Sequence, residues 1–176
     1  MAYVLEQVLL KPTNAEYPPQ PEPGIGLSDL PNARVDVIGS GFRILAENEL
    51  ALRQAVARLH AYSACPLKAS RPSIIFAREP VHSEPVMRVV VRAPLWTLHG
   101  LRKCFQQKGA HIIATGYDEE DWSLHMLAPI SRLLGCYDEV SELYGDVATI
   151  NMTLSHYTPV ETTTLEPLSK VEVMHG

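Results

Sequence analysis

The sequence of 176 residues lacks any apolar run that approaches the roughly 20 residues needed to cross a bilayer. No basic stretch precedes its apolar N-terminal residues, so a signal peptide is not expected either. Cysteine is scarce, since Cys65, Cys104 and Cys136 are widely spaced and odd in number. This pattern argues against a disulfide framework and a paired-cysteine metal site. Together these absences predict a cytoplasmic protein without a membrane contact.

Motifs for phosphate and dinucleotide binding are missing as well. No Gly-rich loop followed by Lys-Ser or Lys-Thr occurs anywhere in the chain. The stretch RVDVIGSGFRIL, residues 34–45, begins as a dinucleotide-binding βαβ unit does, but Ile44 stands where a third glycine is needed after Gly39 and Gly41. We therefore expect a turn between two extended segments and no nucleotide cofactor. An oxidoreductase with a bound dinucleotide is the least favoured functional hypothesis.

No set of residues has the spacing of a catalytic or metal centre. None of the seven histidines has another histidine, a cysteine or a carboxylate at metal-ligand spacing. The acidic run at residues 118–121 is expected at a solvated hairpin tip, where no carboxylate is desolvated for acid–base work. The serines have no visible base partner. We therefore predict a protein that is not an enzyme and that holds neither a metal nor a cofactor.

Charge is present but unevenly distributed. The formal net charge of −5 argues against a protein that binds nucleic acid over its whole surface. Residues 34–78, however, carry seven basic and three acidic side chains. We predict that a basic surface of this segment contacts an anionic partner, with an ordinary solvated helix face as the alternative. The predicted contact residues are Arg53, Arg58, Lys68 and Arg71, and the rival set, on a second predicted helix, is Arg102, Lys103 and Lys108.

The first half of the chain predicts a small α/β segment. Residues 3–10 favour a strand or a short helix, and the five prolines of residues 11–26 indicate a linker or an extended strap. Residues 47–62 have the apolar stripe of an amphipathic helix, and residues 73–77 predict a short buried strand. The stripe consists of Leu52, Ala55, Val56 and Leu59.

The second half has clearer periodicity. In residues 85–94, apolar side chains alternate with Arg88 and Arg92, which is typical of a half-exposed strand. The predicted order is strand 85–94, helix 95–107, strand 110–117, strand 122–129, helix 129–145 and strand 148–157. This βαββαβ order predicts an α+β fold with a ferredoxin-like plait, in which two helices cover one face of an antiparallel sheet.

We expect the chain to have four parts. An N-terminal strand and Pro-rich linker occupy residues 1–33, and the small α/β segment occupies residues 34–82. The plait occupies residues 83–160, and residues 161–176 form a tail.

The two tryptophans fall at the beginning of predicted elements. Trp96 lies in the first turn of a helix and Trp122 at the start of a strand. Both are expected in the core or at a sheet edge. An exposed aromatic anchor at a partner interface is the alternative.

Residues 83–160 resemble the C-terminal domain of elongation factor G-like translational GTPases. The segment SEPVMRVVVRAP is similar to that family's entry strand, and Ser155-His156-Tyr157 after an alternating strand is the most specific element. Upstream, FRILAENELALRQAVARLHAY and SRPSIIFARE resemble the second half of the family's third domain, although Ala51 replaces the histidine of its Gly-Glu-Leu-His motif. A competing register aligns residues 34–62 with the end of the fourth domain.

The resemblance implies binding to the ribosome or its RNA without GTP hydrolysis, because the family's GTPase domain is not matched. Two departures make the expected RNA-contacting surface less basic. Asp146 follows Gly145 where the family has arginine, and Gln107-Lys108-Gly109 replaces Arg-Arg-Gly. We expect a non-catalytic, ribosome- or translation-associated protein. The alternative is an assembly subunit whose plait docks on other proteins or on a second copy of the chain.

Overall fold

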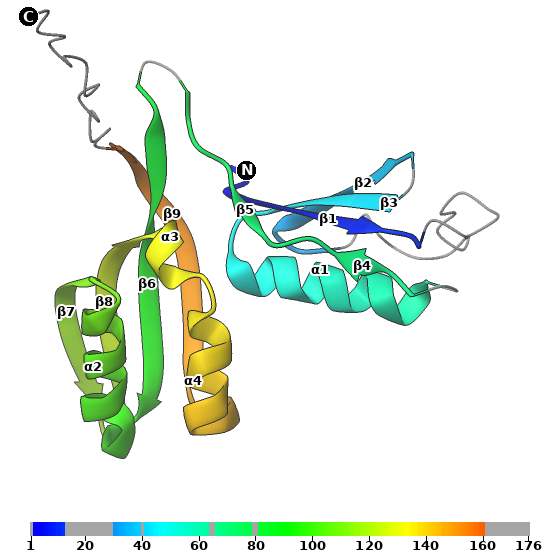
Figure 1. Cartoon of the computed structure of the whole chain (residues 1–176). Helices are drawn as coiled ribbons and strands as arrows, with labels where there is room; N and C mark the ends of the chain where they lie inside the picture. The colour runs from blue at the N-terminus through cyan, green and yellow to red at the C-terminus, as the bar shows by residue number, and fades with distance from the viewer. Residues whose placement is uncertain (1, 13–29, 40, 64–65, 79–80, 161–176) are drawn as a thin grey trace, which may run out of the picture.

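The computed structural model describes residues 2–12, 30–39, 41–63, 66–78 and 81–160. They form two units, each with helical structure against an antiparallel sheet, which confirms the predicted α+β class (Figure 1). Most of the Pro-rich stretch, Cys65 and the tail at 161–176 lie outside the described residues.

The N-terminal unit is a five-stranded sheet with one helix. The strand order is β2-β3-β1-β4, and β5 also pairs with β1. Its elements are β1 (Leu5–Leu10), β2 (Ala33–Ile38), β3 (Gly41–Ala46), α1 (Glu49–Tyr62), β4 (Lys68–Ala69) and β5 (Ser73–Ile74). The N-terminal segment is thus a strand rather than a helix, and its pairing joins it to the 34–82 segment.

The strand predicted at 73–77 is shorter and more exposed than expected. β5 has two residues, of which Ser73 is exposed and Ile74 is half-buried. It pairs with Leu5 and Glu6 of β1, while β4 pairs with the other end of the same strand. Both short strands therefore lie along one edge of β1, at the border of the sheet.

The predicted turn at the Gly-Ser-Gly stretch is confirmed as the passage from β2 to β3, which pair antiparallel up to Ile38 and Gly41. Gly41 permits a close approach of β1, because a Cβ built there would lie 1.9 Å from the carbonyl oxygen of Leu9. Ile44 is fully buried in β3. The residue that stands in for the third glycine is therefore a core residue of a strand, and no helix begins after this turn.

α1 packs on the N-terminal sheet through the predicted apolar stripe. Its N-cap is Asn48, whose side-chain oxygen accepts a hydrogen bond from the N–H of Ala51 at 2.9 Å. Leu52, Ala55 and Leu59 are buried. The helix ends at Tyr62, close to the predicted boundary.

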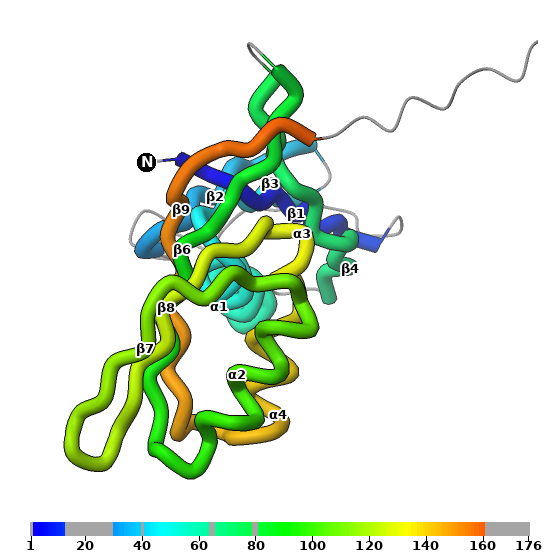
Figure 2. Tube along the Cα trace, turned by 90° about the vertical axis from the view of Figure 1, so that its left-hand side faces the viewer, coloured from blue at the N-terminus to red at the C-terminus, as the bar shows by residue number. Residues whose placement is uncertain are grey.

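The C-terminal unit is the predicted ferredoxin-like plait. Its strands are antiparallel in the order β7-β8-β6-β9, with the helices on one side of the sheet (Figure 2). On β6, Arg88 and Arg92 are exposed between buried apolar residues, which confirms the predicted alternation. The elements are β6 (Ser83–Pro94), η2 (Leu95–Thr97), α2 (Leu98–Gln107), β7 (His111–Asp118), β8 (Asp121–Pro129), α3 (Ile130–Leu133), α4 (Cys136–Tyr144), η3 (Gly145–Val147) and β9 (Thr149–Pro159).

The prediction of one continuous helix from Pro129 to Gly145 is wrong. The chain forms two helices, α3 and α4, separated at Leu134 and Gly135. Gly135 has a φ of +81°, a left-handed conformation that interrupts a right-handed helix and that glycine adopts without steric cost.

The two tryptophans have opposite environments. Trp122 is 1% exposed and belongs to the core, whereas Trp96 is 70% exposed. The core expectation therefore holds for Trp122 and is wrong for Trp96, because Trp96 lies on the outer side of the short η2 turn.

Candidate binding surfaces

The two units meet where the start of α1 faces α4. The side-chain amide of Asn48 donates a hydrogen bond to the carbonyl oxygen of Met152 in β9, at 3.2 Å. The carboxylate of Glu49 accepts one from the N–H of Gly135 at 2.8 Å. Both contacts reach backbone groups of the plait, so the first residues of α1 fasten the N-terminal unit to it.

Glu49 is the buried carboxylate of this joint, with 8% of its surface exposed. Burial raises its pKa, while the N–H groups of Gly135 and Tyr137 and the charge of Arg53 oppose the shift. The carboxylate lies at the N-terminus of α4, where unpaired N–H groups and the helix dipole favour an anion. Sequence reasoning gave Glu49 no role, because its partner lies 86 positions further along the chain.

Arg53, the first of the predicted contact residues, is engaged within the molecule. Its guanidinium forms an ion pair with Asp138 on α4. The same guanidinium lies over the ring of Tyr137, 5.6 Å from the ring centroid. An anionic partner would have to compete with Asp138 for this charge.

A groove of about 640 Å³ lies beside this ion pair, between α1 and the turn from α3 to α4. Its apolar lining includes Leu52, Val56 and Leu134. Its charged lining residues are Glu49, Arg53 and Asp138. Since these groups already bind one another or the α4 terminus, the groove offers no free charge to a ligand.

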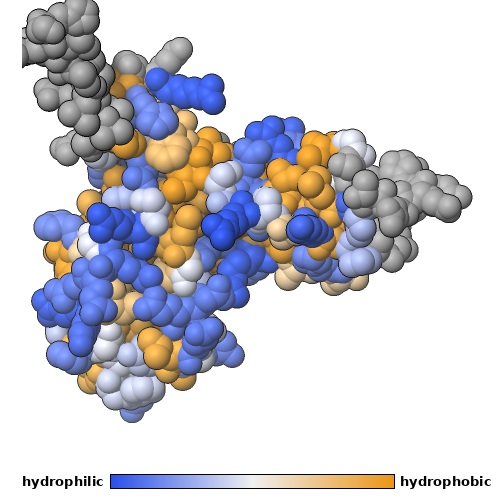
Figure 3. Space-filling model, in the orientation of Figure 1, coloured by the Kyte–Doolittle hydropathy of each residue, from blue (hydrophilic) through white to orange (hydrophobic). Residues whose placement is uncertain are grey.

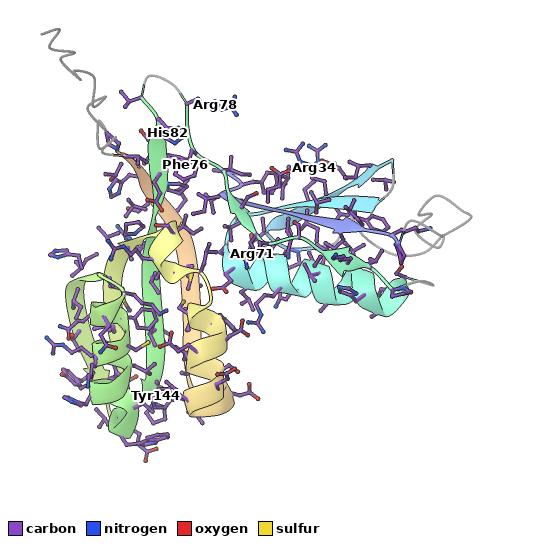
Figure 4. All side chains as sticks on the ribbon, viewed as in Figure 1. Arg34, Arg71, Phe76, Arg78, His82 and Tyr144 are labelled. Atoms are coloured by element: carbon purple, nitrogen blue, oxygen red, sulfur yellow. The ribbon has the colours of Figure 1, made fainter. Side chains whose placement is uncertain are left out.

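The other predicted contact residues do not form one surface. The ammonium of Lys108 lies 2.8 Å from a carboxylate oxygen of Glu139, and this contact lowers the pKa of Glu139. Arg58 is half-buried on α1. Four residues are exposed and have no ion pair within the described part of the chain: Lys68, Arg71, Arg102 and Lys103. The first two belong to the N-terminal unit, where Figure 4 labels Arg71, and the last two belong to α2.

The two described cysteines support the packing of α2 against α4. The thiol of Cys104 donates a hydrogen bond to Glu139 at 3.3 Å, and burial raises its pKa to about 11. Burial raises the pKa of Cys136 to about 12. Both thiols are therefore protonated at neutral pH and are poor nucleophiles.

The face of the C-terminal sheet opposite the helices is not covered by any described element, as Figure 2 shows. Residues directly opposite one another on adjacent strands share a face. The register gives three cross-strand rows, which we call the open face: His111-Leu127-Arg88-Thr153, Ala114-His125-Val90-Asn151 and Gly116-Ser123-Arg92-Thr149.

The open face carries basic side chains and no acidic one. Arg88 and Arg92 are exposed, and neither forms an ion pair with a described residue. Four residues apart on one strand, their backbones are separated by ~13 Å. Acidic groups lie next to two of its edges. Asp118 and Asp121 pair with each other in the row that follows the Arg92 row. At the β9 edge, Glu47 lines a pocket together with Asn151 and Thr153 of the open face.

Sequence reasoning placed Arg88 and Arg92 on the exposed side of a strand but did not select them as contact residues. The reason is that residues 79–160 are acidic as a whole, with ten acidic and six basic side chains. Their histidine neighbours, His111 and His125, come from two other strands. Only strand pairing brings these four residues to one face.

The described residues contain neither a metal-binding cluster nor a helix that could span a membrane. No group of three or more histidine, cysteine or acidic side chains is placed to hold a metal ion in that part of the chain. Among the helices described, none combines the length and apolarity that crossing a membrane requires.

No protein-family model and no curated protein sequence matches this chain. Among solved structures, the chain is similar to ttk003000868, a protein from Thermus thermophilus. The TM-score is 0.58 and the sequence identity is 13%. The match covers 89% of this chain and 41% of that protein, so the chain spans less than half of its length. This likeness shows a shared fold.

Proposed function

We propose that the protein is a non-catalytic RNA-binding protein that acts in the cytoplasm with the ribosome or another translation-associated ribonucleoprotein. The observation that carries the proposal is the open face of the plait. Its three rows combine two histidines with two arginines that form no ion pair with a described residue, and these rows hold no acidic side chain. An uncovered sheet face with basic and imidazole side chains is better suited to bind a single strand of RNA than to pack against the apolar surface of another protein element.

The residues of the open face have complementary roles. Arg88 and Arg92 would each neutralise a phosphate of an extended strand. His111 and His125 offer planar rings on which unpaired bases stack. Thr153 and Asn151 lie on the edge strand β9 and offer hydrogen-bonding groups to bases or to the 2′-hydroxyl.

The non-catalytic part of the proposal is supported by the titratable groups. Each described residue with a shifted pKa has a structural explanation in an ion pair, a helix terminus or a buried thiol. The resemblance of residues 83–160 to the C-terminal domain of elongation factor G-like proteins agrees with a ribosomal partner.

Binding across a salt series tests the proposal. The protein is sedimented with ribosomes and titrated with a labelled single-stranded RNA at increasing potassium chloride. Binding through phosphates should weaken steeply, with the logarithm of the association constant falling linearly with the logarithm of the salt concentration. If the protein binds ribosomes with no salt dependence and does not bind RNA, the alternative of an assembly subunit that docks on protein replaces the proposal.

A further inference from the structure

The end of the plait farthest from the N-terminal unit exposes a cluster of large apolar side chains. In Figure 3 this lower end shows small hydrophobic areas among pale and hydrophilic residues. We call it the distal cluster, and its exposed members are Leu95, Trp96, Tyr117, Leu143 and Val147. Trp96 and Tyr117, 70% and 68% exposed, are the most exposed of them. Exposed apolar side chains that lie together, with polar residues around them, mark interaction sites more often than singly exposed ones do.

Contacts between three segments hold this end of the plait together. The rings of Trp96 and Tyr144 have centroids 6.0 Å apart, which joins η2 to the end of α4 (Tyr144 is labelled in Figure 4). The N–H of Leu95 donates a hydrogen bond to the carbonyl oxygen of Glu120, which joins η2 to the turn between β7 and β8. Three separate segments of the chain therefore meet at this end.

Trp96 is held on a rigid support. The buried indole N–H of Trp122 donates hydrogen bonds to the carbonyl oxygen of Pro94 and to the hydroxyl of Thr97. The Thr97 hydroxyl itself donates to the Pro94 carbonyl at 2.8 Å. These bonds fix the η2 turn on both sides of Trp96. An exposed aromatic ring on a fixed turn loses little freedom when it binds a partner.

Gly100 points to the same surface. It lies inside α2, where alanine is the more favourable residue. A Cβ at Gly100 would lie 1.9 Å from the hydroxyl oxygen of Tyr144. The glycine therefore makes room for the tyrosine that lies beside Trp96.

The distal cluster has an acidic rim. Six carboxylates lie on the turn between β7 and β8, on α4 and on η3, and none forms an ion pair with a described residue. They are Asp118, Glu119, Glu120, Asp121, Glu142 and Asp146. This charge repels nucleic acid. It also disfavours the chain's own residues 161–176, which include three glutamates and one lysine.

We propose that the distal cluster binds a protein segment rich in lysine and arginine that also carries apolar side chains. The apolar groups pack on Trp96 and its neighbours, while the cations face the acidic rim. Aromatic anchors surrounded by a polar rim are typical of protein interfaces. This surface adjoins the Arg92 end of the open face but shares no residue with it, so the proposal goes beyond RNA binding and does not depend on it.

The test uses the full chain and a short acetylated peptide of lysine, arginine and leucine. A matched peptide has glutamate in place of every cation. Calorimetric titration should show binding of the cationic peptide only. Trp96→Ala should weaken that binding roughly tenfold or more, and Gly100→Ala should weaken it while leaving Trp96 in place. Tyr62→Ala removes an apolar side chain that is 50% exposed on α1, and it should leave binding unchanged.

Three results would overturn the proposal. The first is equal binding of the acidic peptide, and the second is unchanged binding by both Trp96→Ala and Gly100→Ala. The third is self-association in analytical ultracentrifugation that Trp96→Ala abolishes, because a second copy of the chain would then be the occupant. RNA binding by Trp96→Ala should equal that of the unchanged protein, so a failure here is distinguishable from a failure of the RNA-binding proposal.

Discussion

Single residues decide how the two units are joined and which charges remain available. Glu49 and Arg53 lie on the same side of α1, and both bind the first turn of α4. The charge of Arg53 is neutralised by Asp138, although Arg53 lies at an exposed position of α1. The presence of basic side chains on an exposed helix face therefore does not by itself show a basic surface. Arg88, by contrast, keeps its charge free of any described carboxylate.

The buried carboxylate of Glu49 gives a pH-dependent prediction. Its pKa in the folded chain is raised, chiefly by burial, so the folded state holds the proton more tightly than the unfolded state does. The contribution of Glu49 protonation to the free energy of unfolding is complete below the pKa of the unfolded state. It is lost as the pH rises through the pKa of the folded state. We expect the free energy of unfolding, relative to Glu49→Gln, to fall between acidic and neutral pH.

Urea denaturation of the unchanged protein and of Glu49→Gln, from acidic to neutral pH, measures the difference between their free energies of unfolding. Glu142→Gln is the control, because Glu142 is exposed on α4 and makes no ion pair with a described residue. A difference between the unchanged protein and Glu49→Gln that stays constant or grows with pH would contradict the assignment.

At the scale of the elements, glycine positions set the close contacts. Gly41→Ala should destabilise the N-terminal sheet by about 1–3 kcal/mol, the usual cost of overpacking. The added methyl would meet the backbone of β1 rather than a movable side chain. Gly39→Ala is the matched control, because a Cβ there has nothing within 4 Å. The stabilities of the two variants are measured by thermal and urea unfolding. Equal stability of Gly41→Ala and Gly39→Ala would refute this account.

The packing of α2 against α4 predicts that the thiols of Cys104 and Cys136 are unreactive in the folded chain. Because the pKa values of Cys104 and Cys136 are raised to about 11 and about 12, neither thiol should react with iodoacetamide in the folded chain at mildly alkaline pH. Both should react after denaturation. Mass spectrometry of proteolytic peptides assigns the labels, and rapid native labelling of either residue would show that the two helices do not pack as described.

Local patterns in the sequence predicted most elements but few of the contacts between them. The alternation around Arg88 predicted β6, and the apolar stripe around Leu52 predicted α1. When one face of an element is buried, apolar residues recur in the sequence with the period of that strand or helix. The break at Gly135 was not predicted, since the apolar residues on both sides of it keep helical spacing, whereas the structure has a left-handed glycine between them. Likewise, the open face exists only once His125 and Val90 are paired across two strands.

The molecule as a whole separates its charges by surface rather than by sequence segment. The acidic turn near Trp96 lies at one end of the plait, and the basic rows lie on the face opposite the helices. An anionic strand is attracted to the second and repelled by the first. A negative net charge is thus compatible with RNA binding at one face.

The most direct test of RNA binding at the open face compares two double variants in one assay. One is Arg88→Ala with Arg92→Ala on the open face, and the other is Arg53→Ala with Arg58→Ala on α1. Anisotropy of a labelled single-stranded RNA across a potassium chloride series gives the affinity and its salt slope. We predict weaker binding by the open-face variant and a slope that is flatter by about 1.4, because each lost phosphate contact on a single strand removes about 0.7. The α1 variant should bind as the unchanged protein does. Loss of binding by the α1 variant, with the open-face variant unaffected, would contradict the account.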